Sequence, residues 1–175
     1  VRLETVSSGA INVDQIISNA AADVVLDSAG AITSVDADDD AADITAANLT
    51  IEAATSVGAS GKALDFNLTT SDITASGDVY FDVVGTGGHS TTIDLSAGNI
   101  EIDGRNTAND GGYEAITLAD VDTDDGTVKV YNYANDITAT LLDNSATDKD
   151  VRLETVSSGA INVDQIISNA AADVV

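Results

Sequence analysis

The chain ends with the same twenty-five residues with which it begins, because VRLETVSSGAINVDQIISNAAADVV spans residues 1–25 and again residues 151–175. Two copies of a segment within one compact domain would lie in different surroundings and would diverge. Identity without a single substitution therefore indicates a tandem array. We expect residues 1–150 to form one complete repeat and residues 151–175 to begin the next. The first residue is Val1, with neither an initiator Met nor an export signal, so we also expect a longer natural chain.

A shorter period lies inside the long one. Four-residue stretches with apolar first and third residues recur along the chain, and all but one of them end in an acid. The third residues of these stretches are Leu3, Leu26, Ile51, Phe81, Ile102, Val130 and Leu153. Their spacing averages about 25 residues. Each stretch precedes a corner of small residues and then a second short strand, which gives six similar units within residues 1–150.

These units predict the fold. Units of this length cannot bury a core alone and are stable only when they stack on their neighbours. Alternating apolar and polar residues indicate strands with one buried face, and the abundance of Thr, Ser, Asn and Gly favours strands and turns over helices. We predict an all-β fold, a parallel β-solenoid (β-helix) with about six rungs per 150-residue repeat. The alternative is a string of tandem β-sandwich modules, although these have no reason to repeat a motif every 25 residues or so.

The solenoid prediction has local consequences. Leu3 and Ile51 should both face the core, so that replacing either with Asp should abolish folding. The two longest rungs should bulge outward at residues 56–62 and 104–112, which leaves the ladder of strands unbroken.

The charge narrows the partners. Six Lys and Arg stand against thirty Asp and Glu, a net charge of −24, which argues against binding to nucleic acid or to anionic membrane surfaces. No apolar run approaches the roughly 18 residues of a membrane span, so membrane insertion is not expected. Cations are the natural partners, and divalent cations could bridge fibres side by side.

Acidic residues supply the candidate metal ligands. Stacked rungs would place five acids in one outward column: Glu4, Asp27, Glu52, Asp82 and Asp103. Carboxylates spaced about 4.8 Å apart repel one another, and calcium, a hard cation that prefers oxygen ligands, would relieve that repulsion. Two Asp-rich loops add further candidates: Asp36, Asp38 and Asp40 in the first, and Asp120, Asp122, Asp124 and Asp125 in the second. The alternative is that these acids are solvated charges and ordinary turn residues.

The sequence favours a structural role over catalysis and over specific ligand binding. β-Helices can carry paired catalytic carboxylates, but this chain has two Phe, four Tyr and no Trp to form a sugar-binding platform. The single histidine, His89, lies beside Ser90 at a Gly-rich corner, and we interpret it as an inert surface residue. We therefore predict that the protein is not an enzyme. Outward Tyr80, Tyr131 and Tyr133 could serve a ligand-binding adhesin, or could be ordinary strand tyrosines.

Two phrases carry a family resemblance: AANLTIEAATSVGASGKALDF at 46–66 and SAGAITSV at 28–35. They resemble the repeats of giant secreted bacterial surface proteins, the β-helical adhesins of the filamentous-haemagglutinin type. The resemblance implies a β-helix that is exported to the cell surface or beyond. With the tandem repeats it predicts a structural segment of a giant extracellular fibre, such as a stalk, sheath, matrix filament or adhesin shaft. The partners of this segment would be further copies of the same repeat.

Overall fold

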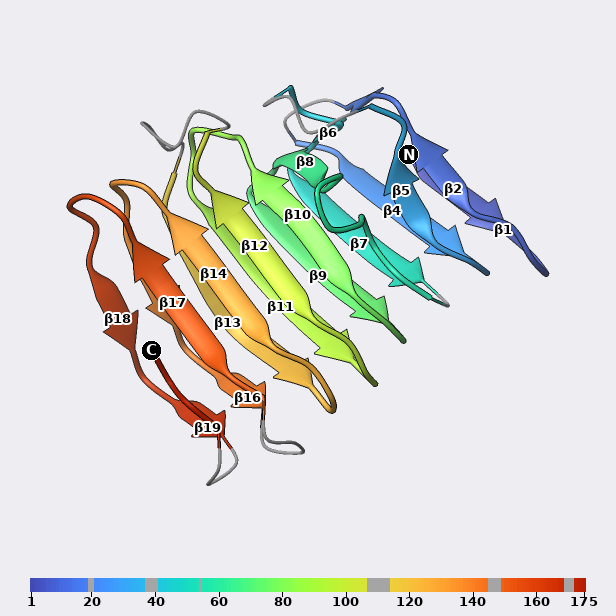
Figure 1. Cartoon of the computed structure of the whole chain (residues 1–175). Coiled ribbons are helices and arrows are strands. Elements are labelled where there is room, and N and C mark those ends of the chain that lie inside the picture. The colour runs from blue at the N-terminus through green and yellow to red at the C-terminus, as the bar shows by residue number, and fades with distance from the viewer. Residues whose placement is uncertain (19–20, 37–40, 54, 107–113, 145–148, 169–171) are drawn as a thin grey trace.

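The computed structural model describes residues 1–18, 21–36, 41–53, 55–106, 114–144, 149–168 and 172–175 of the 175-residue chain. Within these ranges the chain forms strands and turns and no helix. Most of the strands lie in two sheets that face each other (Figure 1). All pairings between these strands are parallel. The predicted parallel β-solenoid is thus confirmed, since sandwich modules are built from antiparallel sheets.

The first sheet, here called sheet A, has ten strands. In chain order they are β1 (Arg2–Thr5), β4 (Asp23–Ser28), β7 (Asn48–Ala53), β9 (Thr70–Ala75), β11 (His89–Leu95), β13 (Ile116–Thr123), β15 (Ile137–Ala139), β16 (Leu142–Asn144), β18 (Ile161–Val163) and β19 (Ile166–Ser168). The two short strands β15 and β16 both pair with β13, one after the other along its length.

The second sheet, sheet B, faces sheet A across the core. Its seven strands are β3 (Ile16–Ile17), β6 (Ile44–Thr45), β8 (Leu64–Asn67), β10 (Val79–Val83), β12 (Ile100–Gly104), β14 (Val128–Asn132) and β17 (Val151–Thr155). A short pair, β2 (Ile11–Val13) and β5 (Ile32–Ser34), extends this side of the solenoid. Single bridges from Ile32 to Val57 and from Val57 to Val79 connect that pair to β10.

One predicted register is wrong. The sequence alignment placed Ile51 beside Phe81, but Ile51 of β7 pairs with Ile73 of β9 within sheet A. Phe81 lies in sheet B, where it pairs with Leu64 and Ile102. The error arose at β9, whose inward residues Ser71 and Ala75 are small, so that the segment does not have the apolar pattern of a main strand.

The two copies of the twenty-five-residue segment lie on opposite sides of the solenoid. β1 belongs to sheet A, whereas β17, which contains the same residues, belongs to sheet B. Six successive strand pairings in sheet A lead from β1 to β15. The chain then crosses to sheet B, where it forms β17. The 150-residue repeat therefore makes about six turns, as predicted, and more closely six and a half.

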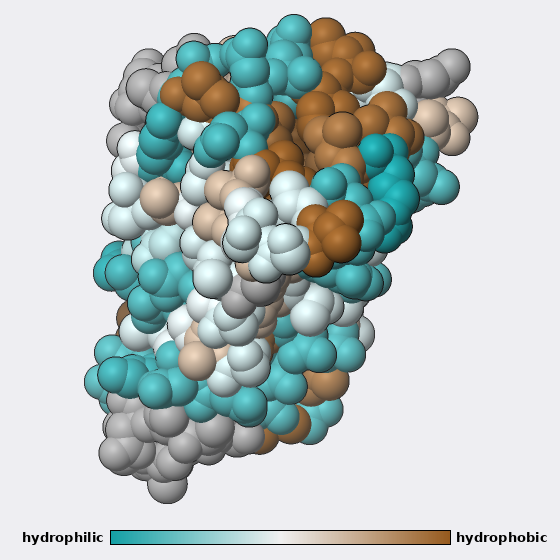
Figure 2. All heavy atoms as spheres, turned by 90° about the vertical axis from the view of Figure 1, so that its right-hand side faces the viewer, coloured by the Kyte–Doolittle hydropathy of each residue, from teal (hydrophilic) through white to brown (hydrophobic). Residues whose placement is uncertain are grey.

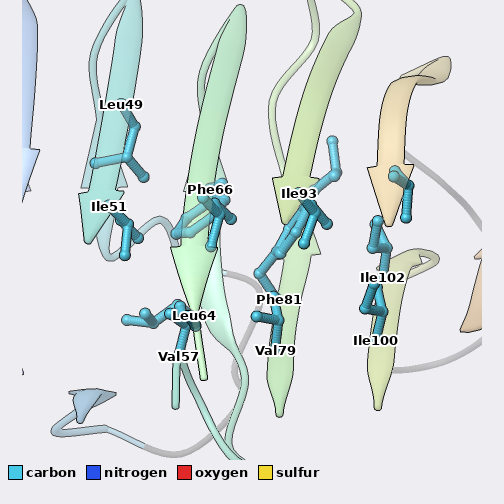
Figure 3. Close-up of a cluster of buried hydrophobic side chains, with 14 of the residues drawn as sticks. Leu49, Ile51, Val57, Leu64, Phe66, Val79, Phe81, Ile93, Ile100 and Ile102 are labelled. Carbon is cyan, nitrogen blue, oxygen red and sulfur yellow. The ribbon is translucent and has the colours of Figure 1, made fainter. Parts of the chain in front are cut away.

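The core is a column of aliphatic side chains between the sheets, with a stacked pair of aromatic rings at its middle (Figure 3). The ring centroids of Phe66 and Phe81 are 4.7 Å apart. Ile51 is buried, as predicted, but Leu3 is 41% exposed, so the structure does not show the burial on which the expected effect of Leu3→Asp depends. Val57 is fully buried, and residues 56–62 are therefore not simply an outward bulge. Most of the second predicted bulge, residues 107–112, lies outside the described residues.

Side-chain hydrogen bonds stabilise two corners across successive turns. Before sheet A, Asn48 Nδ2 donates to Asp23 Oδ1 (2.7 Å), and Thr70 Oγ1 donates to Asn48 Oδ1 (2.6 Å). Before sheet B, Asp78, Asn99 and Thr127 form the same Asp–Asn–Thr series, in which Asn99 Nδ2 donates to Asp78 Oδ1 (3.1 Å) and Thr127 Oγ1 donates to Asn99 Oδ1 (2.9 Å). These bonds link each turn to the next outside the backbone ladder.

His89 is part of the core and is not the surface residue that the sequence predicted. Only 1% of its surface is exposed. Its Nδ1 lies 3.3 Å from the Leu68 carbonyl oxygen and its Nε2 lies 3.1 Å from Ser71 Oγ, which is itself hydrogen-bonded to Thr91 Oγ1 (2.8 Å). Burial lowers the pKa of His89 from 6.5 to about 4, although the hydrogen bond to Leu68 opposes this shift.

The burial of His89 predicts a pH dependence of stability. Between its unfolded pKa of 6.5 and its folded pKa of about 4, the unfolded chain binds a proton that the folded chain does not. The contribution of His89 is therefore complete above pH 6.5 and falls by roughly 3 kcal/mol as the pH is lowered to about 4. Urea unfolding of the wild type and of His89→Gln, which cannot titrate, should show the flatter pH profile in the variant. Equal slopes would contradict the buried position.

Candidate functional site

A ladder of carboxylates runs along the outer face of sheet A. The register places Glu4, Asp27 and Glu52 on neighbouring strands, as predicted. The same outward position then continues through Thr74 of β9 to three further acids: Asp94, Asp122 and Asp143. A parallel row two residues earlier holds Asp72, Thr92 and Asp120. Acids therefore occupy successive turns of one face, spaced by the roughly 4.8 Å between strands.

The remaining predicted ligands lie on the opposite side of the solenoid. Asp82 and Asp103 are neighbours in sheet B, followed by Tyr131 and Glu154. The single predicted column is therefore wrong, because the alignment crossed from one sheet to the other between Glu52 and Asp82. The sequence predicted the acids Glu4, Asp27 and Glu52 of sheet A and Asp82 and Asp103 of sheet B. It did not predict that the ladder of sheet A continues through Asp94 and Asp143, because these acids lie outside the recurring four-residue stretches.

The two faces differ in how their acids are compensated. On sheet B, Arg105 Nη2 lies 2.5 Å from Asp103 Oδ2, and its guanidinium carbon lies 4.4 Å from the centre of the Tyr131 ring. Lys129 Nζ lies 3.9 Å from Glu101 Oε2 on the same face. On sheet A, Arg2 pairs with Asp27 at the end of the ladder (2.8 Å). Among the described residues, no ion pair involves Asp72, Asp94, Asp120 or Asp122.

Asp122 is the centre of the uncompensated part of sheet A. Burial raises its pKa, and the neighbouring charges of Asp143, Asp124, Asp94 and Asp120 raise it further. A surface hollow of about 240 Å³ lies here, and its lining includes Asp72, Asp94, Asp120 and Asp122. We call the region formed by these four aspartates the acidic face. Its chemistry favours cations, because each unit of positive charge bound there reduces like-charge repulsion.

Most of the first predicted Asp-rich loop lies outside the described residues, and the second is divided between a strand and a turn. Asp38 and Asp40 lie outside the described residues, and Asp36 is exposed. Asp120 and Asp122 belong to strand β13, and Asp124 and Asp125 form the turn that follows it. In that turn the backbone of Asp124 and Asp125 bonds to Leu95 and Gly98 of the preceding turn. Across the described ranges, no group of three or more His, Cys, Asp or Glu residues is arranged to hold a metal ion.

Sequence reasoning missed Glu114, which is buried beneath the Gly-rich corner that precedes His89. Its carboxylate accepts the backbone N–H groups of Gly87 and Gly88, and these bonds partly offset the upward shift in pKa that burial causes. Its Oε1 has no hydrogen-bond partner within the described structure. Glu114, which belongs to the next turn of the solenoid, therefore holds the GTGG corner in place by accepting its backbone N–H groups. Nothing in its own sequence surroundings indicates this contact, because the contact depends on the stacking of turns.

A scan against protein-family models found no matching family, and searches of curated proteins and of solved structures found no match either. No helix in the described ranges is long and apolar enough to span a membrane.

Removing one charge from the acidic face should stabilise the protein. Asp122→Asn should raise the free energy of unfolding at pH 7 by roughly 0.5–1 kcal/mol, because it removes repulsion from the aspartates on both adjacent strands. The pKa of Asp122 is raised on folding, so the penalty is absent at low pH and develops as the pH rises through that pKa. Wild type and variant should therefore converge at about pH 3. The control is Asp14→Asn, an exposed acid outside the ladder, which should change little.

Proposed function

We propose that this chain is a structural repeat of a giant extracellular fibre, of the kind represented by β-helical bacterial adhesins. The observation that carries the proposal is the junction between repeats. β17, the first strand of the second copy, pairs with β14 of the first copy over five residues from Val128↔Val151 to Asn132↔Thr155. The sheet is thus continuous from one repeat into the next.

The junction is as well packed as the interior of a repeat. Val151 is fully buried and Leu153 is 6% exposed, comparable with Val128 and Val130 on the strand before them. Backbone hydrogen bonds continue across it, with Val156 N donating to the Asn132 oxygen (2.9 Å) and Ser157 N to the Tyr133 oxygen (2.7 Å). Repeats joined in this way form one continuous solenoid whose stability grows with repeat number.

This geometry supports the proposed role as stalk, sheath, matrix filament or adhesin shaft. Such a role asks for length and stiffness and for no active site, so we propose that the protein is not an enzyme. We also propose that it is secreted and that its partners are further copies of the same repeat. The resemblance to filamentous-haemagglutinin-type adhesins supports this proposal through its shared fold, the β-solenoid.

Proteins with one, two and three copies of residues 1–150, each followed by residues 151–175, test the proposal. Six and a half turns at the usual strand spacing predict that each added repeat lengthens the particle by about 31 Å at constant width. Small-angle X-ray scattering and electron microscopy measure both quantities. Flexible strings of beads, or compact particles whose width grows with repeat number, would refute a continuous fibre.

We further propose that calcium or a similar divalent cation binds the acidic face and stabilises or bundles the fibres. Support comes from the net charge of −24 and from Asp72, Asp94, Asp120 and Asp122, which form no ion pair within the described residues. In this proposal the cation bridges oxygens on adjacent turns, since six to eight oxygen ligands suit Ca²⁺.

Thermal unfolding at fixed ionic strength measures this effect. Calcium should raise the midpoint by several degrees relative to chelator, and the double variant Asp94→Asn/Asp122→Asn should lose most of that increase. The control is the double variant Asp14→Asn/Asp164→Asn, which removes the same number of charges from exposed positions elsewhere. It should retain the increase in midpoint that calcium causes. If sodium at matched ionic strength has the same effect as calcium, the acids attract only a diffuse ion cloud.

A further inference from the structure

Glu114 is a buried carboxylate without a counter-charge. Only 4% of its surface is exposed, and no ion pair within the described residues involves it. Figure 2 looks along the solenoid from the side of β1 and shows apolar residues gathered between hydrophilic ones. A charge inside such a structure is unfavourable unless it is paired with an opposite charge or coordinates a metal ion. The carboxylate of Glu114 therefore requires a compensating positive charge.

The two oxygens of this carboxylate have different surroundings. The backbone N–H groups of Gly87 and Gly88 donate to the carboxylate, that of Gly88 to Oε2. Donors of this kind favour the ionised form of a carboxyl group. Oε1 is also buried, but it has no hydrogen-bond partner within the described structure. The GTGG corner at residues 85–88 thus holds the ionised carboxylate and leaves Oε1 for a further partner.

A second oxygen points to the same place. A Cβ added to Gly85 would lie 2.7 Å from Glu114 Oε1 and 2.8 Å from Asn67 Oδ1. Both oxygens therefore flank one point beside Gly85, and no side chain of residue 85 comes between them. Two oxygens placed in this way repel each other unless a positive charge lies between them. Their arrangement is that of two ligands of one ion.

Both ligands are held in position by other parts of the solenoid. Asn67 is the last residue of β8, and its backbone oxygen accepts a hydrogen bond from Ala46 N (3.3 Å). The backbone oxygen of Glu114 accepts a hydrogen bond from Nδ2 of the fully buried Asn132 (2.8 Å). Asn67 itself is exposed, so that an ion can reach the corner from solvent. The two oxygens thus form a fixed and accessible pair.

We propose that a small cation binds between Glu114 Oε1 and Asn67 Oδ1 beside the GTGG corner, and that Ca²⁺ fits this position. Calcium accepts carboxylate, amide and water oxygens in a flexible geometry, so that water can complete a site with few protein ligands. The net charge of −24 enriches cations around the molecule. We expect a dissociation constant of about 10⁻⁴–10⁻³ M, as in weak extracellular calcium sites.

This corner site is distinct from the acidic face. The acidic face lies on the outer surface of sheet A, whereas Glu114 lies before β13 and is buried in the solenoid. A bound cation would connect the turn that contains Asn67 with the turn that contains Glu114, and it would stabilise the corner that precedes His89. The inference does not depend on the proposed fibre function, and its failure would leave that proposal unaffected.

A calcium titration followed by NMR tests the corner site directly. The protein used is Asp94→Asn/Asp122→Asn, in which cation binding to the acidic face is weakened. The backbone amide signals of Gly87 and Gly88 and the side-chain amide signals of Asn67 should shift together along one saturating curve. Sodium at matched ionic strength should not reproduce these shifts, because a diffuse ion cloud does not saturate at one site.

Matched variants in the same background identify the two ligands. Glu114→Gln should remain folded, because the new amide can donate to Asn67 Oδ1, and it should lose the calcium response. Asn67→Asp adds a second carboxylate and should lower the dissociation constant roughly tenfold. The control is Asn12→Asp, which adds the same charge at an exposed position where Oδ1 can still accept from Thr33 Oγ1. It should leave calcium binding at the corner unchanged.

Two results would overturn the corner site. In the first, the signals of Gly87 and Gly88 do not respond to calcium at concentrations well above the expected dissociation constant; a proton, or the amide of Asn67 turned to donate, then satisfies Oε1. In the second, Asn67→Asp and Asn12→Asp bind calcium equally well, so that Asn67 is not a ligand. Asn67 is exposed, so its substitution keeps the test valid even if Glu114→Gln unfolds. Circular dichroism checks the strand content of each variant.

Discussion

Parallel in-register pairing is the interaction on which the other features of this structure depend. Each strand lies beside the strand one turn away, so equivalent positions on successive turns are neighbours at roughly 4.8 Å. The pairing gives the apolar residues of both sheets a shared interior, where Phe66 and Phe81 stack. The same spacing brings outward acids such as Asp94 and Asp122 next to each other. Core stability and surface repulsion are therefore two results of one geometry.

The corners show how the chain reinforces that pairing. The Asp–Asn–Thr series at Asp78, Asn99 and Thr127 satisfies backbone and side-chain groups across three turns at once. Glu114 likewise satisfies backbone N–H groups at the Gly87–Gly88 corner, although burial of its carboxylate is energetically unfavourable. Small residues are needed where successive turns come close: a Cβ added to Gly126 would lie 1.7 Å from the Gly98 oxygen. The corners thus tolerate few substitutions even though they are largely on the surface.

The sequence was sufficient to predict the fold class, the approximate number of turns and most inward residues, because these follow from local alternation and from the 25-residue period. The sequence did not reveal that Ile51 and Phe81 lie in different sheets and are not neighbours in register. That register depends on whether TSDITA forms a full strand, and its small inward residues give no local signal.

His89 was misplaced for a related reason. A histidine beside glycines reads as a surface residue until the stacking of turns places Phe66 and Phe81 around it. The acid ladder was half predicted, since Glu4, Asp27 and Glu52 repeat visibly while Asp94 and Asp143 do not.

In the array of repeats proposed above, the half turn left over in each 150-residue repeat would give a two-fold screw symmetry. Successive repeats present opposite flanks to any fixed direction, so a bend that one repeat introduces is reversed by the next. A fibre of many such repeats would run straight even if each repeat were slightly curved. Its acidic flank alternates from side to side with a period of two repeats, about 62 Å. Neighbouring fibres would therefore meet the same pattern of charge from either side, which suits a sheet or bundle more than a pair.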